Sequence, residues 1–130
     1  MDDLQSALEE RAEVRLAVLF GSSARDGAGR DADLALIIAP DTPALRRSLE
    51  ADLGRAAGRA VDIVYLDQAP PLLRFEIARD GKVLIERIAH LWADVRARAM
   101  IDWWDWAPQA RMLFAAAARR LREKVPSGQA

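Results

Sequence analysis

The stretch LFGSSARDGAGRDADLALII, residues 19–38, runs from one apolar segment through a Gly-Ser turn and a polar loop into a second apolar segment. Residues 14–20 (VRLAVLF) consist mostly of branched apolar side chains and are followed by Gly21, a pattern that predicts a buried strand. Residues 33–38 (DLALII) predict a second strand, which Pro40 ends. The polar residues between these strands are the first place to look for a functional site.

The Gly-Ser turn has the features of an anion site. Gly21 lets the backbone approach a ligand closely, and a helical turn starting at Ser22 would direct free amides at a phosphate. Arg25 could add a positive charge to the same site. A strand followed by Gly-Ser is also a common ordinary turn, so the turn alone does not distinguish the two interpretations.

Three aspartates suggest a metal site. Asp31 and Asp33 stand at alternate positions, which point to one face of a strand, and Asp62 lies in a third predicted strand, residues 60–66 (AVDIVYL). Carboxylates grouped in this way can bind one or two divalent cations. The alternative is that Asp31 and Asp33 are solubilising surface residues and that Asp62 is a buried acid paired with an arginine. Taken together with the Gly-Ser turn, the three aspartates favour the site.

The composition limits which metal the chain can hold. The chain has no cysteine and only one histidine, His90, so thiolate and histidine-rich sites are excluded. Carboxylate ligands indicate Mg²⁺, Mn²⁺ or Ca²⁺.

Length and charge bound the class of protein. The 130 residues suit one domain, with a core at about 1–86 and C-terminal helices at about 87–124. Because no apolar run approaches the roughly 20 residues of a membrane span, and the acidic start does not resemble a signal peptide, we expect a cytoplasmic protein that binds no membrane. The net charge of −1 argues against direct nucleic-acid binding, although 8 basic and 4 acidic residues at 87–130 suit an acidic partner.

The remaining segments predict an α/β (α+β) fold with helices packed on a small mixed sheet. Asp41 or Thr42 caps a helix that starts at Pro43 and that Gly58 closes. Pro108 is expected to separate the last two helices. The predicted elements are helices at 3–12, about 43–57, about 70–79, 88–106 and 108–124, and a short strand at 82–86.

The sequence resembles the signature of the DNA polymerase β-type nucleotidyltransferases. That signature consists of Gly-Ser, ten further residues, Asp-x-Asp and a later Asp in an apolar strand. The chain most resembles the minimal nucleotidyltransferases (MNT), which act as antitoxins beside HEPN toxins. Residues 59–87 (RAVDIVYLDQAPPLLRFEIARDGKVLIER) look like the segment that those proteins carry after the third Asp, and the resemblance extends to about Trp106. It implies a polymerase β-like nucleotidyltransferase fold.

The motif departs from the family pattern at one position. Without gaps, ten residues lead from Gly21-Ser22 to Asp33 as the first family Asp, and Ala35 stands at the second. An alanine methyl group cannot bind a metal. A shifted alignment uses Asp31 and Asp33 instead, with a loop two residues shorter. We prefer the gap-free alignment, in which DLALII matches the family's second strand.

The resemblance implies transfer of AMP from ATP to a tyrosine of a HEPN toxin. Gly21, Ser22 and Arg25 would bind the phosphates, and Asp33 and Asp62 would bind Mg²⁺ or Mn²⁺, joined by Asp31 only in the shifted alignment. Asp62 would also orient the attacking hydroxyl and help to deprotonate it.

Loss of one strong electrostatic element costs such sites about 10² to 10³ in rate. The alternative function is therefore a catalytically degenerate binding module that neutralises a HEPN partner by contact. A third interpretation, a nucleotidyltransferase for aminoglycosides or other small molecules, lacks an obvious acidic pocket or substrate domain.

Three tryptophans mark a candidate partner interface. Trp103, Trp104 and Trp106 fall within MIDWWDWAPQARMLF, residues 100–114, and cannot all lie on one helical face. Some are therefore expected to be exposed, where a toxin or a second copy of the chain could cover them. The alternative is that all three close the core against the final helix. The basic segment 118–124 is expected to be a solvated face.

Overall fold

The computed structural model describes residues 2–21 and 32–124. Its elements are α1 (Asp2–Glu9), β1 (Val14–Phe20), β2 (Ala32–Ile38), α3 (Pro43–Ala57), β3 (Val61–Tyr65), a 3-10 turn η1 (Leu66–Gln68), α4 (Pro71–Asp80), β4 (Lys82–Glu86) and α5 (Leu91–Lys124). The predicted mixed α/β fold is confirmed, and the four predicted strands lie within one residue of the observed bounds. No helix in the described part of the chain is both long enough and apolar enough to span a bilayer.

The four strands form one mixed sheet in the order β3-β2-β1-β4. β1 is antiparallel to both β2 and β4, whereas β2 and β3 are parallel. A parallel pair needs a crossover connection, which α3 supplies here. Its ends match the prediction, because the Thr42 hydroxyl accepts a hydrogen bond from the Leu45 amide (3.1 Å) and Gly58 ends the helix with a φ of 65°.

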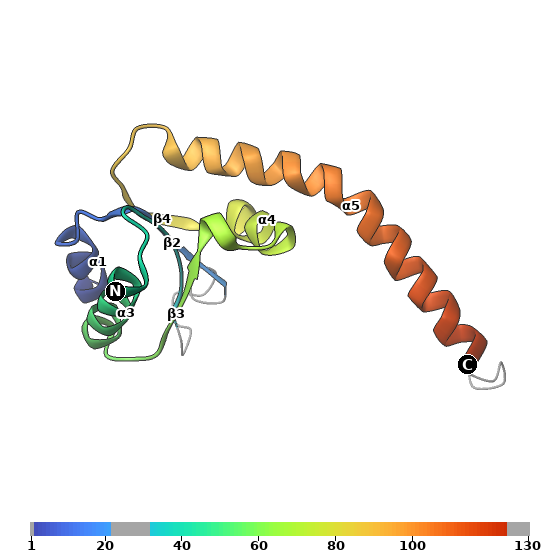
Figure 1. The fold of residues 1–130 in the computed structure, drawn as a ribbon, viewed down its shortest axis with the longest axis horizontal. Helices are drawn as coiled ribbons and strands as arrows, with labels where there is room; N and C mark the ends of the chain where they lie inside the picture. The colour runs from blue at the N-terminus through green and yellow to red at the C-terminus, as the bar shows by residue number, and fades with distance from the viewer. Residues whose placement is uncertain (1, 22–31, 125–130) are drawn as a thin grey trace.

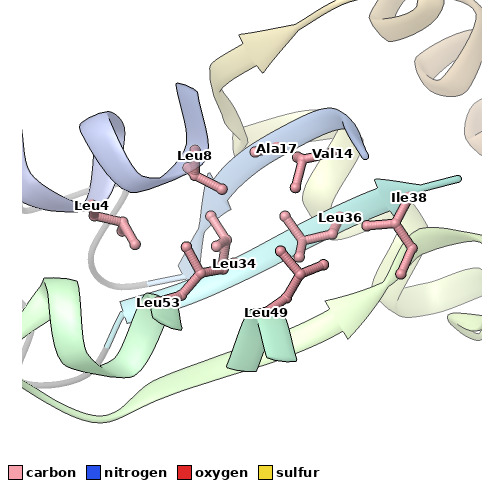
Figure 2. Packing of buried hydrophobic residues seen from close by; sticks show 9 residues of the cluster. All are labelled: Leu4, Leu8, Val14, Ala17, Leu34, Leu36, Ile38, Leu49 and Leu53. Atoms are coloured by element: carbon pink, nitrogen blue, oxygen red, sulfur yellow. The ribbon is translucent and has the colours of Figure 1, made fainter. Parts of the chain in front are cut away.

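One face of the sheet packs against α1 and α3 (Figures 1 and 2). Because side chains alternate along a strand, Leu34, Leu36 and Ile38 of β2 all point to this face. The cluster, shown in Figure 2, consists of Leu4, Leu8, Val14, Ala17, Leu34, Leu36, Ile38, Leu49 and Leu53. It contains no polar side chain and forms a closed hydrophobic core.

The opposite face packs against α4 and the first part of α5. Its buried cluster joins three strand residues to one residue each from η1 and α4, and consists of Leu16, Val18, Ala35, Leu66 and Ile77. Trp92 and Val95 of α5 pack against this cluster from outside. The first part of α5 therefore belongs to the folded body.

Helix α1 ends at Glu9, three residues earlier than predicted. The Arg87 guanidinium donates hydrogen bonds to the carbonyls of Leu8 (3.2 Å) and Glu9 (2.7 Å), which satisfies acceptors left free at the helix end. Ala12, which lies within the predicted helix 3–12, is outside the observed helix and exposed. The predicted boundary was wrong because a distant arginine fixes the end of the helix.

The prediction of two C-terminal helices was also wrong. α5 is one helix of 34 residues with Pro108 inside it. Proline lacks an amide hydrogen, so the helix loses one backbone bond there, and Figure 1 shows it bending in this region. Beyond the bend, α5 extends away from the sheet and its covering helices (Figure 1).

Candidate functional site

Asp33 lies near the start of β2, between residues of two neighbouring strands. Its partners in the sheet are Phe20 of β1 and Asp62 of β3. In the parallel pair β2–β3, residues opposite each other point to the same face. The two aspartates that sequence reasoning selected from different strands are thus brought together, on the face that α4 and α5 cover farther along the strands.

Gly21 makes room for the Asp33 carboxylate. It has a φ of 73°, and a Cβ atom placed on it would lie 2.4 Å from Asp33 Oδ2. Only glycine combines this backbone conformation with so close an approach. Sequence reasoning assigned Gly21 to phosphate binding, and the structure gives it a second reason to be glycine. No sequence signal could have shown this contact, because it depends on how the strands meet.

The Asp62 side chain is exposed to solvent. Val61, Ile63 and Tyr65, on either side of it along β3, turn to the α1–α3 face and pack against the core there. The alternative that Asp62 is a buried acid is therefore wrong. Exposure leaves the carboxylate accessible to a ligand.

Ala35 is two residues along β2 from Asp33, on the same face. Its side chain is fully buried, and its partner across the β2–β3 pair is Val64. It packs in the cluster with Leu16, Val18 and Ile77. The position that the family pattern gives to a second carboxylate therefore lies in apolar surroundings.

Asp33 and Asp62 together offer carboxylate oxygens that suit one divalent cation. Within residues 2–21 and 32–124, no group of three or more acidic or histidine side chains is arranged to hold a metal. The described part of the chain therefore contributes two carboxylates, Asp33 and Asp62, to this edge of the sheet. Ser22, Arg25 and Asp31, which were also predicted to belong to the site, lie outside the described residues.

The tryptophans divide between core and surface. The Trp103 ring stacks on Phe75 of α4, with centroids 4.9 Å apart, and contacts Trp106 at 5.3 Å. Trp104 is 69% exposed. The expectation that the three could not share one face is correct: Trp103 and Trp106 are partly buried, and Trp104 faces solvent.

A cavity that sequence reasoning missed lies where η1, α4 and α5 meet the end of β2. It has a volume of about 230 Å³ and is lined by Ile37, Leu66, Asp67, Arg74, Val95 and Arg98. Arg74 forms an ion pair with Asp102 (2.8 Å). Ile37 is four residues from Asp33, so about 13 Å of strand separates the cavity from the acid pair.

Tyr65, at the opposite end of β3 from Asp62, has a shifted pKa. Partial burial, and then the nearby Glu50 carboxylate, raise the pKa of Tyr65 to about 12. The Arg46 guanidinium lies over the Tyr65 ring at 3.9 Å. Hydrogen bonds from Arg46 lower the pKa of the Asp41 carboxyl. Tyr65 is three residues from Asp62, so about 10 Å of strand separates the two side chains' backbone positions.

Comparison with known proteins agrees with this geometry. The model of the polymerase beta nucleotidyltransferase family matches residues 2–89. No curated protein matches the sequence. Solved structures share the fold at low sequence identity, and three of them are described next.

A chain from a toxin–antitoxin crystal structure with AMP-PNP has a TM-score of 0.76 and 20% identity, covering 90% of this chain and 97% of that one. A chain from the MntA–HepT toxin–antitoxin complex gives 0.72 and 18%, covering 90% and 95%. A chain from a complex of tri-AMPylated Shewanella oneidensis HEPN toxin with MNT antitoxin gives 0.69 and 18%, covering 88% and 98%.

The family model covers more than half of the chain and includes every strand of the sheet. It also includes Gly21, Asp33 and Asp62. This protein therefore belongs to the polymerase beta nucleotidyltransferase family, and it shares its fold with chains of MNT–HEPN toxin–antitoxin complexes.

Proposed function

We propose that this chain is the antitoxin of an MNT–HEPN pair and that it binds a HEPN-type toxin. Family membership and a fold shared with chains of two such complexes support the proposal. The exposed Trp104, with Ile101 one helical turn before it, provides an apolar surface on α5 for that partner.

The pairing of Asp33 with Asp62 supports AMP transfer to the toxin as the reaction of this site. The oxygen of a toxin hydroxyl would bond to the α phosphorus of ATP, and pyrophosphate would leave. Asp62, which solvent can reach, would take the proton of that hydroxyl. A bound Mg²⁺ or Mn²⁺ supplies positive charge that neutralises the triphosphate.

Ala35 favours a second mode, neutralisation by contact. It removes one carboxylate from the family pattern, a change that costs such sites about 10² to 10³ in rate. The Ala35 methyl group is buried among apolar side chains, so it does not contact a bound ligand. We therefore propose contact as the main mode and AMP transfer as a slow reaction.

The test uses the purified chain, ATP, Mg²⁺ and a purified HEPN-type toxin from the same genome. Toxin ribonuclease activity and toxin mass are measured together, so that inhibition and AMP addition are separated. We expect inhibition at stoichiometric antitoxin before most toxin gains the mass of AMP. Inhibition should persist in Asp33→Asn and Asp62→Asn, with Asp67→Asn as a control for the lost charge.

Two results would contradict the proposal. Inhibition that follows AMP addition in time and disappears in Asp33→Asn would make transfer the main mode. Absence of both binding and inhibition would remove the assignment as a HEPN antitoxin.

A further inference from the structure

Helix α5 has one packed side. Trp92 and Val95 pack against the buried cluster on the sheet, and Trp103 stacks on Phe75 of α4. Successive helical residues are about 100° apart, so these three side chains of α5 lie within about 80° of one another around the helix axis. The opposite side of the helix points away from the sheet and α4.

Six exposed residues form an apolar stripe on that opposite side. They follow one another at intervals of three or four residues, which keeps them within about 80° around the axis and makes the stripe about 27 Å long. The stripe consists of Ala97, Ile101, Trp104, Pro108, Met112 and Ala115. Near its start, Ala97 and Ile101 also line an open hollow of about 490 Å³.

The part of α5 that follows Pro108 has no cover from the rest of the described chain. Met112 is 73% exposed and Leu113 is 66% exposed, and no described side chain beyond Pro108 belongs to a buried cluster. Figure 1 shows this part extending away from the sheet and the other helices. Because helices in proteins gain most of their stability by packing one face, a partner is expected to cover this part of α5.

The shape of the stripe indicates what kind of element covers it. The stripe is narrow, nearly straight and follows the axis of a helix. Ridges of side chains three and four residues apart are the surface that a second helix packs against. Recognition between helices uses apolar side chains at this same spacing. A helix of the partner therefore fits the stripe.

The charge of α5 indicates which partner supplies that helix. Residues 108–124 carry five basic side chains and one acidic side chain, and Arg119 continues the line of the stripe. A second copy of this chain in antiparallel orientation would bring residues 91–107, with two basic and three acidic side chains, against this basic end. That small negative excess does not balance the positive one, and a parallel copy would place two basic ends together. The charge therefore favours a different protein with acidic side chains.

We infer that the stripe from Ala97 to Ala115 is the docking site for a helix of the HEPN-type toxin, and that this helix carries acidic side chains opposite Arg119. The inference deepens the proposed function and rests on its choice of the toxin as partner. It extends the contact surface from Ile101 and Trp104 along the whole open side of α5.

The neighbouring residues Met112 and Leu113 provide a matched test. Both are exposed, but they lie about 100° apart around the axis, and only Met112 belongs to the stripe. Isothermal titration of the full-length chain with the purified toxin compares Met112→Asp with Leu113→Asp, and circular dichroism confirms that both variants keep their helix content. We expect Met112→Asp to raise the dissociation constant at least about tenfold, and Leu113→Asp to change it less than about threefold.

Charge reversal tests the acidic contact. Arg119→Glu should raise the dissociation constant about fivefold or more, because it places like charges opposite each other. Raising the salt concentration from about 0.1 M to about 0.5 M should weaken toxin binding by the unaltered chain more than binding by Arg119→Glu, since salt screens an attraction that the variant lacks. Equal affinity of Arg119→Glu and the unaltered chain would overturn the acidic contact.

The outcomes separate this inference from the proposed function. Unchanged affinity in Met112→Asp, or equal losses in Met112→Asp and Leu113→Asp, would overturn the docking site while toxin binding stands. Absence of binding by the unaltered chain would overturn both. Analytical ultracentrifugation of the chain alone tests the other occupant: a dimer that dissociates in Met112→Asp and persists in Leu113→Asp would assign the stripe to a second copy and overturn the inference.

Discussion

The two faces of the sheet share the same strands but differ in what they contain. The face toward α1 and α3 is apolar along its whole length, from Leu34 to Ile38 on β2. The face toward α4 and α5 is apolar at Ala35 and carries Asp33 and Asp62 at its edge. The first face is therefore packed with apolar side chains throughout, whereas the second combines packing with a candidate site.

This difference shows how a site in this fold can change while the fold stays intact. Neighbouring strand residues point to opposite faces, so a substitution at position 35 leaves Leu34 and Leu36 in the other core unchanged. An alanine at position 35 removes a ligand and adds a small buried side chain. The following predictions test this separation of the two faces.

The largest loss of stability is expected from the closed core. Leu36→Ala removes a fully buried side chain from the α1–α3 face and should lower the free energy of unfolding by about 2–5 kcal/mol. Urea denaturation followed by circular dichroism measures this loss. A loss below about 1 kcal/mol would contradict the contribution assigned to this core.

A matched pair of buried substitutions compares the faces directly. Ala35→Asp and Ala17→Asp each place a carboxylate at a fully buried position, but on opposite faces. Each should lose about 3 kcal/mol, because the carboxyl group loses its hydration. Saturating Mn²⁺ should raise the melting temperature of Ala35→Asp more than that of Ala17→Asp, since an ion that gains a ligand stabilises the folded state.

The same pair tests catalysis. If Ala35 is the reason for slow AMP transfer, the folded Ala35→Asp variant should transfer AMP at least about 10² faster than the unaltered chain. An equal response of both variants to Mn²⁺ would mean that position 35 does not reach the ion.

Substitution of Trp103 should mainly lower stability, whereas substitution of Trp104 should mainly weaken toxin binding. Trp103→Ala removes the stack on Phe75 and should cost about 2 kcal/mol of stability, whereas Trp104→Ala should change stability by less than about 0.5 kcal/mol. Trp104→Ala should also weaken toxin binding, raising the dissociation constant by about tenfold or more. Isothermal titration with the toxin measures this change. Unchanged affinity in Trp104→Ala would place the interface elsewhere.

The smallest effect concerns pH. The pKa of Tyr65 is about 12 in the folded protein, above the ordinary value of about 10. The folded state therefore holds this proton more tightly than the unfolded state does. The resulting stability is fully present below pH 10 and is lost as the pH rises from 10 through 12. The decline in urea midpoint over this range should be smaller in Tyr65→Phe, and identical declines would exclude Tyr65 as its cause.

Much of the fold could be predicted because its signals are local. Short apolar runs bounded by glycine and proline located the strands, and Thr42, Pro43 and Gly58 marked the ends of α3. The end of α1 could not be predicted, because it depends on Arg87, which is far away in the sequence. The continuity of α5 through Pro108 was missed because a proline lowers helix stability without always ending a helix.

For the candidate site, the side-by-side placement of two aspartates on neighbouring strands could be predicted from the sequence. Strand alternation and the family resemblance selected Asp33 and Asp62, which the sheet then aligns. Whether Asp62 was buried depended on what covers β3, and the approach of Gly21 to Asp33 depended on how β1 and β2 meet. Neither is encoded in a local pattern. The roles of both aspartates as metal ligands stay predictions.

The length of α5 beyond Pro108 determines how far a partner bound at its end lies from the candidate site. From Pro108 to Lys124 it rises about 1.5 Å per residue, or about 25 Å in all, and this part extends beyond the folded body (Figure 1). A partner that binds only the C-terminal end of α5 would lie well away from Asp33 and Asp62. Any hydroxyl that such a partner offers to Asp62 must therefore come from a segment long enough to reach back along the helix.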